Sequence, residues 1–204
     1  MPQEPTIFVV DDDDAVRRAL AGAGELLGRP VQAFGSAAEF LAAFDPTHPG
    51  CLVLDLRMPG MTGFELQRRL ADDGVPIPII VVSGHADVRT AVEVMTRGAV
   101  TLLEKPFRLD ELLAHLREAL ELDAANRARA DRQAAAAARL AGLTAKEREV
   151  LEAVAAGKTN REIADELGLS VRAVEDRRAR LMKKLEARSV AELIQLLTRR
   201  GESS

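Results

Sequence analysis

The stretch Cys51-Leu52-Val53-Leu54-Asp55 is a short apolar run that ends in an acid, and similar runs recur through the first 120 residues. Continuous apolar runs of this length are typical of strands buried on both faces of a parallel sheet. Amphipathic, helix-like stretches separate them. The predicted strands are 7–10, 31–34, 51–54, 79–82 and 101–103, of which 31–34 is the more exposed. We therefore predict an α/β fold with a doubly wound five-stranded parallel sheet, whose sites form at the carboxyl ends of the strands.

The second half of the chain has helical patterns throughout. No glycine or proline occurs between Phe107 and Ala141, and residues 121–139 consist mostly of Ala, Arg, Asp and Gln, of which Ala and Arg are strong helix formers. A flexible low-complexity linker is the alternative, but this composition favours a helix that continues the preceding one and frays near Gly142. We divide the chain into a domain at 1–122, a helical linker at 123–140 and an all-α domain at 141–204.

The last domain contains repeated signals for helix starts. Capping boxes, in which Ser or Thr is followed three residues later by Glu, begin at Thr144, Thr159 and Ser189. Ser170 can cap a further helix, and Gly157 and Gly168 are suitable stops between helices. These signals predict four short helices with tight connections.

Composition and charge narrow the class of protein. The contents of 47% hydrophobic and 29% charged residues are ordinary for a soluble globular protein. No signal-peptide pattern and no apolar run long enough to span a bilayer is present, and the single Cys51 fits a cytoplasmic protein. The net charge is −7 over residues 1–120 but +3 over 121–204, and +4 within 169–188 alone. We expect an acidic domain joined to one that can contact a polyanion.

Polar residues follow four of the predicted strands: Asp11 and Asp12, Asp55, Ser83, and Lys105. The ends of parallel strands share one edge of the sheet, so these side chains can converge. Converging carboxylates repel one another, and Mg²⁺ relieves that repulsion with a few carboxylates and several waters. One carboxylate can then attack phosphorus, while the metal, a hydroxyl and an ammonium hold the phosphoryl oxygens. Each residue alone could be a turn, a cap or a surface charge, but their shared placement favours a phosphoacceptor site.

Four segments resemble the receiver domains of response regulators, over residues 6 to about 120, and are most similar to the FixJ branch: Val9–Asp12, Leu54–Gly60, Val82–His85 and Glu104–Phe107. The resemblance implies that Asp55 is the phosphoacceptor and Asp12 a direct Mg²⁺ ligand. It implies that Asp11 acts mainly through water and that the backbone carbonyl of Arg57 is a further ligand. Ser83 would bind the phosphoryl group after switching, Lys105 would pair with it, and the Lys105–Pro106 bond would be cis.

One position departs from the receiver pattern. The family usually has an aromatic residue three positions before the lysine, and this chain has Leu102 there and contains no Tyr or Trp. Leu102 can repack, but an aromatic rotamer switch cannot operate at this position. We expect the signal to pass through a shift of the segment after Ser83.

Three further segments resemble the LuxR-type DNA-binding domain, over about 141–204: Leu143–Leu151, Gly157–Ala164 and Lys183–Leu185. The resemblance implies a helix-turn-helix with Thr159–Gly168 as scaffold helix and Ser170–Leu185 as recognition helix. Helical projection of the latter puts Val171, Val174, Leu181 and Leu185 on one face. A merely solvated opposite face is the alternative, but the context and positive charge favour DNA contact. The predicted DNA-binding residues are Arg172, Glu175, Asp176, Arg177, Ala179, Arg180, Lys183 and Lys184.

Two of the family's base-facing positions are acidic here. By the resemblance, these positions are Glu175, Asp176 and Ala179. An acid is repelled by DNA unless it accepts a hydrogen bond, for example from cytosine N4, and an alanine can touch a thymine methyl group. We expect an unusual DNA sequence preference.

Together these observations predict a transcriptional regulator of a two-component system and not an enzyme. A sensor histidine kinase would phosphorylate Asp55. The change would favour a homodimer through residues 87–101 and the fifth strand, release the DNA-binding domain, or both. Two linked copies bind a two-half-site operator more tightly than one, and RNA polymerase would be a further partner.

Two other functions are weighed against this one. A phosphatase of the haloacid-dehalogenase type also uses an Asp nucleophile and Mg²⁺, but it needs a second Asp where this chain has Arg57. A regulator that works without phosphorylation would use its acids only structurally. A phosphatase assay distinguishes the first, and DNA binding with and without acetyl phosphate distinguishes the second.

Overall fold

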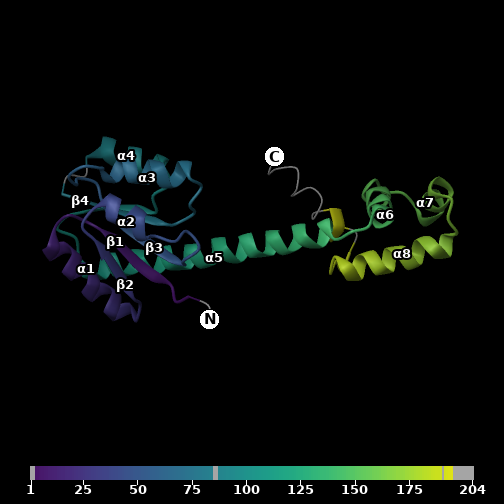
Figure 1. Ribbon diagram of the computed structural model, residues 1–204, viewed down its shortest axis with the longest axis horizontal. Coiled ribbons are helices and arrows are strands. Elements are labelled where there is room, and N and C mark those ends of the chain that lie inside the picture. Colours follow the sequence, from purple (N-terminus) through teal and green to yellow (C-terminus); the bar gives the residue numbers. More distant parts are fainter. Residues whose placement is uncertain (1–2, 85–86, 190, 195–204) are drawn as a thin grey trace. The chain divides into compact units, whose positions relative to one another are not determined.

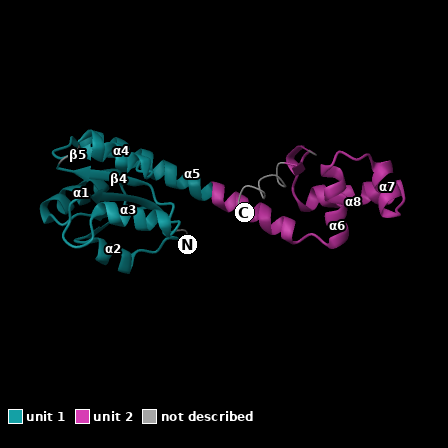
Figure 2. Ribbon diagram, turned by 90° about the horizontal axis from the view of Figure 1, so that it is seen from above, with its two compact units in different colours: residues 1–128 teal, residues 129–204 magenta. Residues whose placement is uncertain are grey.

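The computed structural model of the protein describes residues 3–84, 87–189 and 191–194 (Figure 1). The chain forms two compact units, residues 1–128 and 129–204, which Figure 2 colours separately. The strands are β1 (Thr6–Val10), β2 (Val31–Phe34), β3 (Gly50–Asp55), β4 (Ile79–Ser83) and β5 (Thr101–Glu104). The helices of the first unit are α1 (Asp14–Leu27), α2 (Ala37–Ala43), α3 (Gly63–Asp72), α4 (Val88–Thr96) and the first part of α5 (Leu109–Ala141). Those of the second unit are the rest of α5, α6 (Ala145–Ala155), α7 (Asn160–Leu167) and α8 (Val171–Lys184).

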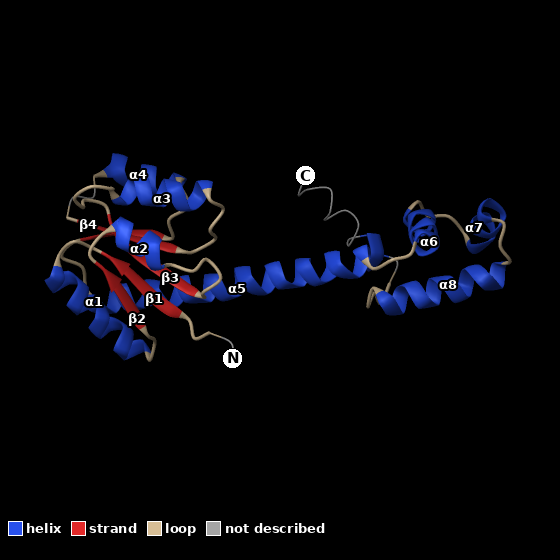
Figure 3. Ribbon diagram, viewed as in Figure 1, coloured by secondary structure: helices blue, strands red, loops and turns tan. Residues whose placement is uncertain are grey.

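The first unit is a five-stranded parallel sheet in the order β2-β1-β3-β4-β5. Its strands are red in Figure 3, where β1 to β4 are labelled. This order confirms the predicted doubly wound α/β fold. The crossovers put helices on both faces of the sheet, so β1, β3 and β4 are buried along their whole length. The edge strand β2 is more exposed, as its sequence predicts.

Alternate strand residues build two separate cores. Val10, Leu54 and Val81 pack with residues of α2, α3 and α4 on one face. Val9 and Val53 pack with residues of α1 and α5 on the other face. The side chains of a strand point to opposite faces in turn, so one apolar run serves both cores. This explains why the strands read as continuous apolar segments.

The strand ends differ slightly from the prediction. Asp55 and Ser83 were expected directly after their strands, and each is instead the last residue of its strand. Asp55 pairs with Val82 in the ladder, and Ser83 pairs with Glu104, so the sheet register extends through both polar residues. Both therefore have backbones fixed by the sheet.

Helix α5 is a single helix of 33 residues, which confirms the helical linker. It ends at Ala141, next to the predicted fraying point at Gly142. Because it runs through both predicted domain limits, the boundaries at 122/123 and 140/141 stay a prediction. None of the helices in the described part of the chain has the length and apolar character of a transmembrane span.

The second unit is helical, with most of its predicted caps in place. Thr144 and Thr159 form reciprocal capping boxes with Glu147 and Glu162, and Ser170 caps α8 through the amide of Ala173. Gly157 and Gly168 have positive φ angles of 78° and 63°, which suit glycine at these stops.

The fourth predicted helix begins at Ser189, which accepts a hydrogen bond from the amide of Glu192. Glu192 itself accepts from the amide of Arg188 and not from Ser189, so the contact differs from the predicted capping box. Residues 191–194 are helical, and the remainder of this prediction, at 190 and 195–204, lies outside the described residues.

One residue of the predicted apolar face of α8 is not buried. Val174, Leu181 and Leu185 are buried in the core of the second unit, but Val171 is 42% exposed. Val171 is the first residue of α8. Helix side chains lean toward the N-terminus, so at this position the side chain extends past the start of the helix.

Candidate functional site

The carboxyl edge of the sheet gathers most of the predicted site residues. Asp11 directly follows β1, Asp55 and Ser83 end β3 and β4, and Lys105 directly follows β5. Since β1, β3, β4 and β5 are successive neighbours in the sheet, these four residues lie along the same edge.

Lys105 connects two of the acids. Its Nζ donates to Oδ2 of Asp11 and to Oδ1 of Asp55, both at 2.6 Å. The remaining oxygens are also bonded, because Oδ1 of Asp11 accepts from the amide of Asp13 at 2.9 Å and Oδ2 of Asp55 accepts from the amide of Arg57 at 2.6 Å. Asp11 is 1% exposed and Asp55 is 5% exposed. The site thus holds two buried carboxylates around one ammonium group.

Burial and ion pairing have opposite effects on the pKa values of Asp55 and Lys105 in this cluster. Burial raises the pKa of Asp55, while the hydrogen bond and the charge of Lys105 act to lower it. Burial acts to lower the pKa of Lys105, but the hydrogen bonds to Asp11 and Asp55 and the charges of these two acids together outweigh burial and raise the pKa. Lys105 therefore stays a cation, and its charge balances that of the neighbouring acids.

The acids do not all converge. Asp12 is exposed, and in the described part of the chain no three His, Cys, Asp or Glu side chains form a group that could hold a metal by themselves. Mg²⁺ commonly binds through one or two carboxylates and keeps several waters, so Asp11 and Asp55 provide a donor set of the right chemistry. The roles of Asp12 and of the Arg57 carbonyl as ligands stay predictions.

Ser83 and Leu102 lie on the neighbouring strands β4 and β5. Ser83 is 1% exposed, and its carbonyl accepts a hydrogen bond from the amide of Lys105 at 2.8 Å. Leu102 is half-buried and packs against the core on the α2–α4 side. The Lys105–Pro106 bond is cis, as the receiver resemblance implied. The contacts of Ser83 and Lys105 with a phosphoryl group stay predictions.

Arg17 and Gly63 also help to shape the site, although no role was predicted from the sequence for either. Arg17 of α1 donates to the backbone carbonyl of Asp11 and pairs with Asp14, which holds the acidic loop against α1. Gly63, the first residue of α3, lies so close to β3 that a Cβ atom would sit 2.2 Å from the carbonyl oxygen of Asp55. The i, i+3 spacing of Asp14 and Arg17 was a usable signal, whereas nothing local marks Gly63.

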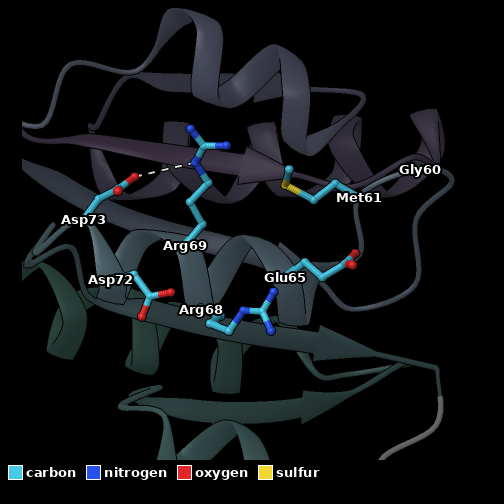
Figure 4. A pocket seen from close by; sticks show the side chains of 7 residues that line it. All are labelled: Gly60, Met61, Glu65, Arg68, Arg69, Asp72 and Asp73. Carbon is cyan, nitrogen blue, oxygen red and sulfur yellow. Dashed lines mark ion pairs between the residues drawn. The ribbon is translucent and has the colours of Figure 1, made fainter.

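A hollow of about 420 Å³ lies on α3 and the loop before it (Figure 4). Apart from Gly60 and Met61 its lining residues are charged, and Figure 4 marks one ion pair among them, between Arg69 and Asp73 at 3.6 Å. None of its lining residues belongs to the Asp11–Asp55–Lys105 cluster, so we assign no function to it.

The exposed face of α8 carries most of the predicted DNA-contacting residues. Arg172, Glu175, Asp176, Ala179, Arg180 and Lys183 are exposed, and Arg177 is half-buried. Lys184 is exposed but forms an ion pair with Glu147 at 2.9 Å. Hence α8 presents a mixed-charge face opposite its apolar contacts with the core.

A contact between α7 and α8 was not predicted. Arg178 donates to the side-chain oxygen of Asn160, the first residue of α7, at 2.6 Å. This hydrogen bond holds the two helices of the predicted helix-turn-helix together. It joins residues 18 positions apart, which no helical periodicity reveals.

The sheet order and the Asp–Lys–Asp cluster at its carboxyl edge define the first unit as a receiver domain, and α7 and α8 form the helix-turn-helix of the second. Residues 7–117 match the response regulator receiver domain, and residues 141–197 match the bacterial regulatory proteins of the luxR family. The chain belongs to the response regulators with a LuxR-type DNA-binding domain, a family of transcription regulators and not of enzymes. A receiver domain implies a histidine kinase as partner, and this helix-turn-helix implies DNA.

Curated relatives match over nearly the full length. The chain is 43% identical to the transcriptional regulatory protein FixJ of Azorhizobium caulinodans, with 96% of this chain and 93% of that protein covered. It is 39% identical to the response regulator protein TmoT of Ectopseudomonas mendocina, with 98% and 91% covered.

Solved structures match as well. The structure of the response regulator StyR has a TM-score of 0.85 at 39% identity and covers 96% of this chain and 99% of its own. Full-length FixJ from B. japonicum has a TM-score of 0.58 at 40% identity, with 99% and 100% covered.

Proposed function

We propose that the protein is a phosphorylation-controlled transcription regulator that accepts a phosphoryl group on Asp55 and then binds its operator more tightly. The observation that carries this proposal is the position of the Lys105 Nζ, 2.6 Å from both Asp11 and Asp55. An ammonium held between a potential nucleophile and a second acid supplies positive charge where phosphoryl oxygens arrive.

Asp55, Lys105 and Ser83 have different roles in the proposed phosphorylation. Asp55 attacks phosphorus with a carboxylate oxygen, which must first leave its hydrogen bond to Lys105 or to the amide of Arg57. The bond between phosphorus and the donor, the kinase histidine or acetate, breaks, and the donor leaves with that electron pair. Lys105 then pairs with the phosphoryl group, and Ser83 donates its hydroxyl to it. Because the amide of Lys105 is bonded to the carbonyl of Ser83, movement at either residue reaches the other.

Asp11, Asp12, Asp55 and the carbonyl of Arg57 would hold Mg²⁺ in this proposal. The bound ion supplies charge neutralisation for the phosphoryl group. Asp11 supports the assignment because it is almost fully buried beside Asp55 and shares its cation. Removal of Mg²⁺ with a chelator should therefore stop phosphorylation of Asp55.

The dimer surface that we propose lies on α4 and β5. Val88, Val92 and Met95 of α4 are 81%, 60% and 47% exposed. Their spacing of four and three residues puts them on one helix face. An exposed apolar stripe of this kind supports contact with a second copy after phosphorylation.

DNA contact is assigned to α8. Arg172, Arg177, Arg180, Lys183 and Lys184 would contact phosphates, and Glu175, Asp176 and Ala179 would face bases. The exposure of most of this face supports the assignment. Two linked copies would bind a two-half-site operator. A sensor histidine kinase would donate the phosphoryl group and RNA polymerase would be a further partner, all in the cytoplasm where the DNA lies.

The test uses full-length protein, acetyl phosphate, Mg²⁺ and genomic fragments selected by the protein itself. We expect treatment with acetyl phosphate to tighten binding of the selected fragments and to increase the mass in solution toward a dimer. Asp55→Asn should bind the same fragments without any response to acetyl phosphate. An equal response of the wild type and of Asp55→Asn would contradict the proposal.

A further inference from the structure

The linker part of α5 begins with several polar contacts to the receiver. Asp123 is 2% exposed although it lies beyond Ala119, the last buried α5 residue of the sheet-facing core. Its Oδ2 accepts a hydrogen bond from the amide of Gly50 at 2.9 Å. An unpaired buried carboxylate is costly, so the partners of Asp123 decide what it does.

Arg127 supplies the opposite charge one helical turn later. Its Nε lies 2.9 Å from both carboxylate oxygens of Asp123. Its terminal nitrogens donate to the carbonyls of Thr47 and His48 at 2.7 and 2.6 Å. We call Asp123, Arg127, the amide of Gly50 and these two carbonyls the linker clamp. All three nitrogens of one guanidinium group are used, which fixes its direction as well as its position.

The loop that receives the linker clamp is itself fixed to β1. The Thr6 hydroxyl lies 2.8 Å from Nε2 of His48, and the ring of Phe8 meets the ring of His48 edge to face at 5.6 Å. Gly50 approaches β1 so closely that a Cβ atom would lie 1.9 Å from the Thr6 carbonyl oxygen. The linker clamp therefore holds α5 to a part of the receiver that cannot shift easily.

Strand β3 carries both the Gly50 amide of the linker clamp and the phosphoacceptor Asp55. Gly50 is the first residue of β3 and Asp55 is the last. They lie five positions apart, which is about 16 Å along the strand. The structure thus joins the start of the linker to the central strand whose other end carries Asp55.

The rest of the linker makes few contacts of its own. Residues 129–138 are exposed except for the half-buried Ala136. At its far end, Leu140 is 5% exposed in the core of the second unit, and Arg139 pairs with Glu186 at 2.6 Å. Each end of the linker is fixed to its own unit, and the linker clamp provides the polar contacts at the receiver end.

We propose that Asp123 and Arg127 are positioning residues for phosphorylation control: they hold the start of the linker helix to the receiver so that a change at Asp55 reaches the DNA-binding domain. This inference rests on the proposed function. Buried ion pairs contribute little net stability but specify one geometry, and that is the role assigned here. Without the linker clamp, residues 121–128 lose their attachment, and the receiver can change state without moving the linker.

The test compares Arg127→Ala, Arg127→Lys and the matched control Arg129→Ala in the full-length chain. Arg129 lies on the same helix, is exposed, and has no ion pair within the described residues. The first measurement is hydrogen exchange of the Gly50 amide and of amides 121–128 without phosphorylation. We expect Arg127→Ala to speed this exchange about ten- to a hundredfold, the effect of losing charge-assisted hydrogen bonds, and Arg129→Ala to leave it unchanged.

The second measurement is the ratio of DNA affinities with and without acetyl phosphate, together with acyl-phosphate labelling of Asp55. We expect Arg127→Ala to be labelled like the wild type but to bind DNA equally tightly with and without acetyl phosphate. Arg127→Lys should give an affinity ratio between those of Arg127→Ala and the wild type. Arg129→Ala should keep the wild-type ratio. A wild-type ratio in Arg127→Ala overturns the inference. If that variant fails to fold and to label, Arg127→Lys decides, because a wild-type ratio there also overturns it. If acetyl phosphate does not change the DNA affinity of the wild type, the proposed function is wrong, and this inference is wrong with it.

Discussion

Replacing Gly63 with alanine tests how tightly α3 packs against the phosphoacceptor strand. The added Cβ atom would lie 2.2 Å from the carbonyl oxygen of Asp55 and 2.8 Å from the Cα atom of Leu56. Both are backbone atoms, so no side-chain rotation can relieve the contact, and the loop between β3 and α3 must move. The substitution therefore perturbs the residue that we propose as phosphoacceptor without removing any polar group.

The expected change in the free energy of unfolding follows from two opposing effects. Overpacking against backbone costs about 3 kcal/mol, the upper end of its usual range. Alanine gains about 1 kcal/mol over glycine in a helix interior, and that gain applies only in part to Gly63, the first residue of α3. Gly63→Ala should therefore lower the free energy of unfolding by about 2 to 3 kcal/mol and slow acyl-phosphate formation at Asp55. Chemical denaturation and labelling with acetyl phosphate measure the two effects.

Gly22→Ala is the matched control. Gly22 lies within α1, and a Cβ atom there would have no other atom within 4 Å. This variant should gain up to about 1 kcal/mol of stability and label normally. If Gly63→Ala behaved like Gly22→Ala in both assays, the close approach of α3 to Asp55 would be refuted.

Three further predictions concern other parts of the chain. Burial, with a smaller contribution from Asp123, raises the pKa of the Cys51 thiol to about 12, so a maleimide should label Cys51 only after denaturation, and rapid labelling of the folded protein would contradict this burial. The hydrogen bonds from Lys184 and from the Thr144 amide lower the pKa of Glu147 to about 2 from an ordinary 4.5. Its contribution to stability is therefore complete above pH 4.5 and is lost as the pH falls toward 2, so denaturation should show Glu147→Gln less stable than the wild type at neutral pH but not in strong acid. Arg172→Ala should reduce DNA affinity on all fragments alike and lower the slope of log affinity against log salt by about 1, whereas a loss confined to one base position would contradict a phosphate contact.

Much of the fold was predictable because its signals are local. The apolar runs at β1, β3 and β4 identify buried parallel strands, since both faces of the sheet are covered. The capping boxes at Thr144 and Thr159 identify helix starts by residue type and spacing alone. The convergence of Asp11, Asp55 and Lys105 followed from one topological rule about strand ends.

The remaining features depend on contacts that are distant in the sequence. Asp123 lies within a helical pattern and would be taken for a solvated charge, but it is buried by the amide of Gly50, 73 residues away. Helical projection does not reveal the exposure of Val171, because projection ignores that a side chain at the first position of a helix extends past its start. Gly63 is required only because α3 begins against the backbone of β3. Such constraints arise between elements, so no residue pattern within one element reveals them.

The central claim is tested most directly by locating the phosphoryl group in the full-length chain. Protein treated with acetyl phosphate and Mg²⁺ is reduced with borohydride, which converts an aspartyl phosphate to homoserine, and the modified position is read by peptide mass spectrometry. We expect homoserine at position 55 alone, and none when Mg²⁺ is withheld. Modification at another acid, or none at position 55 in folded protein, would contradict it.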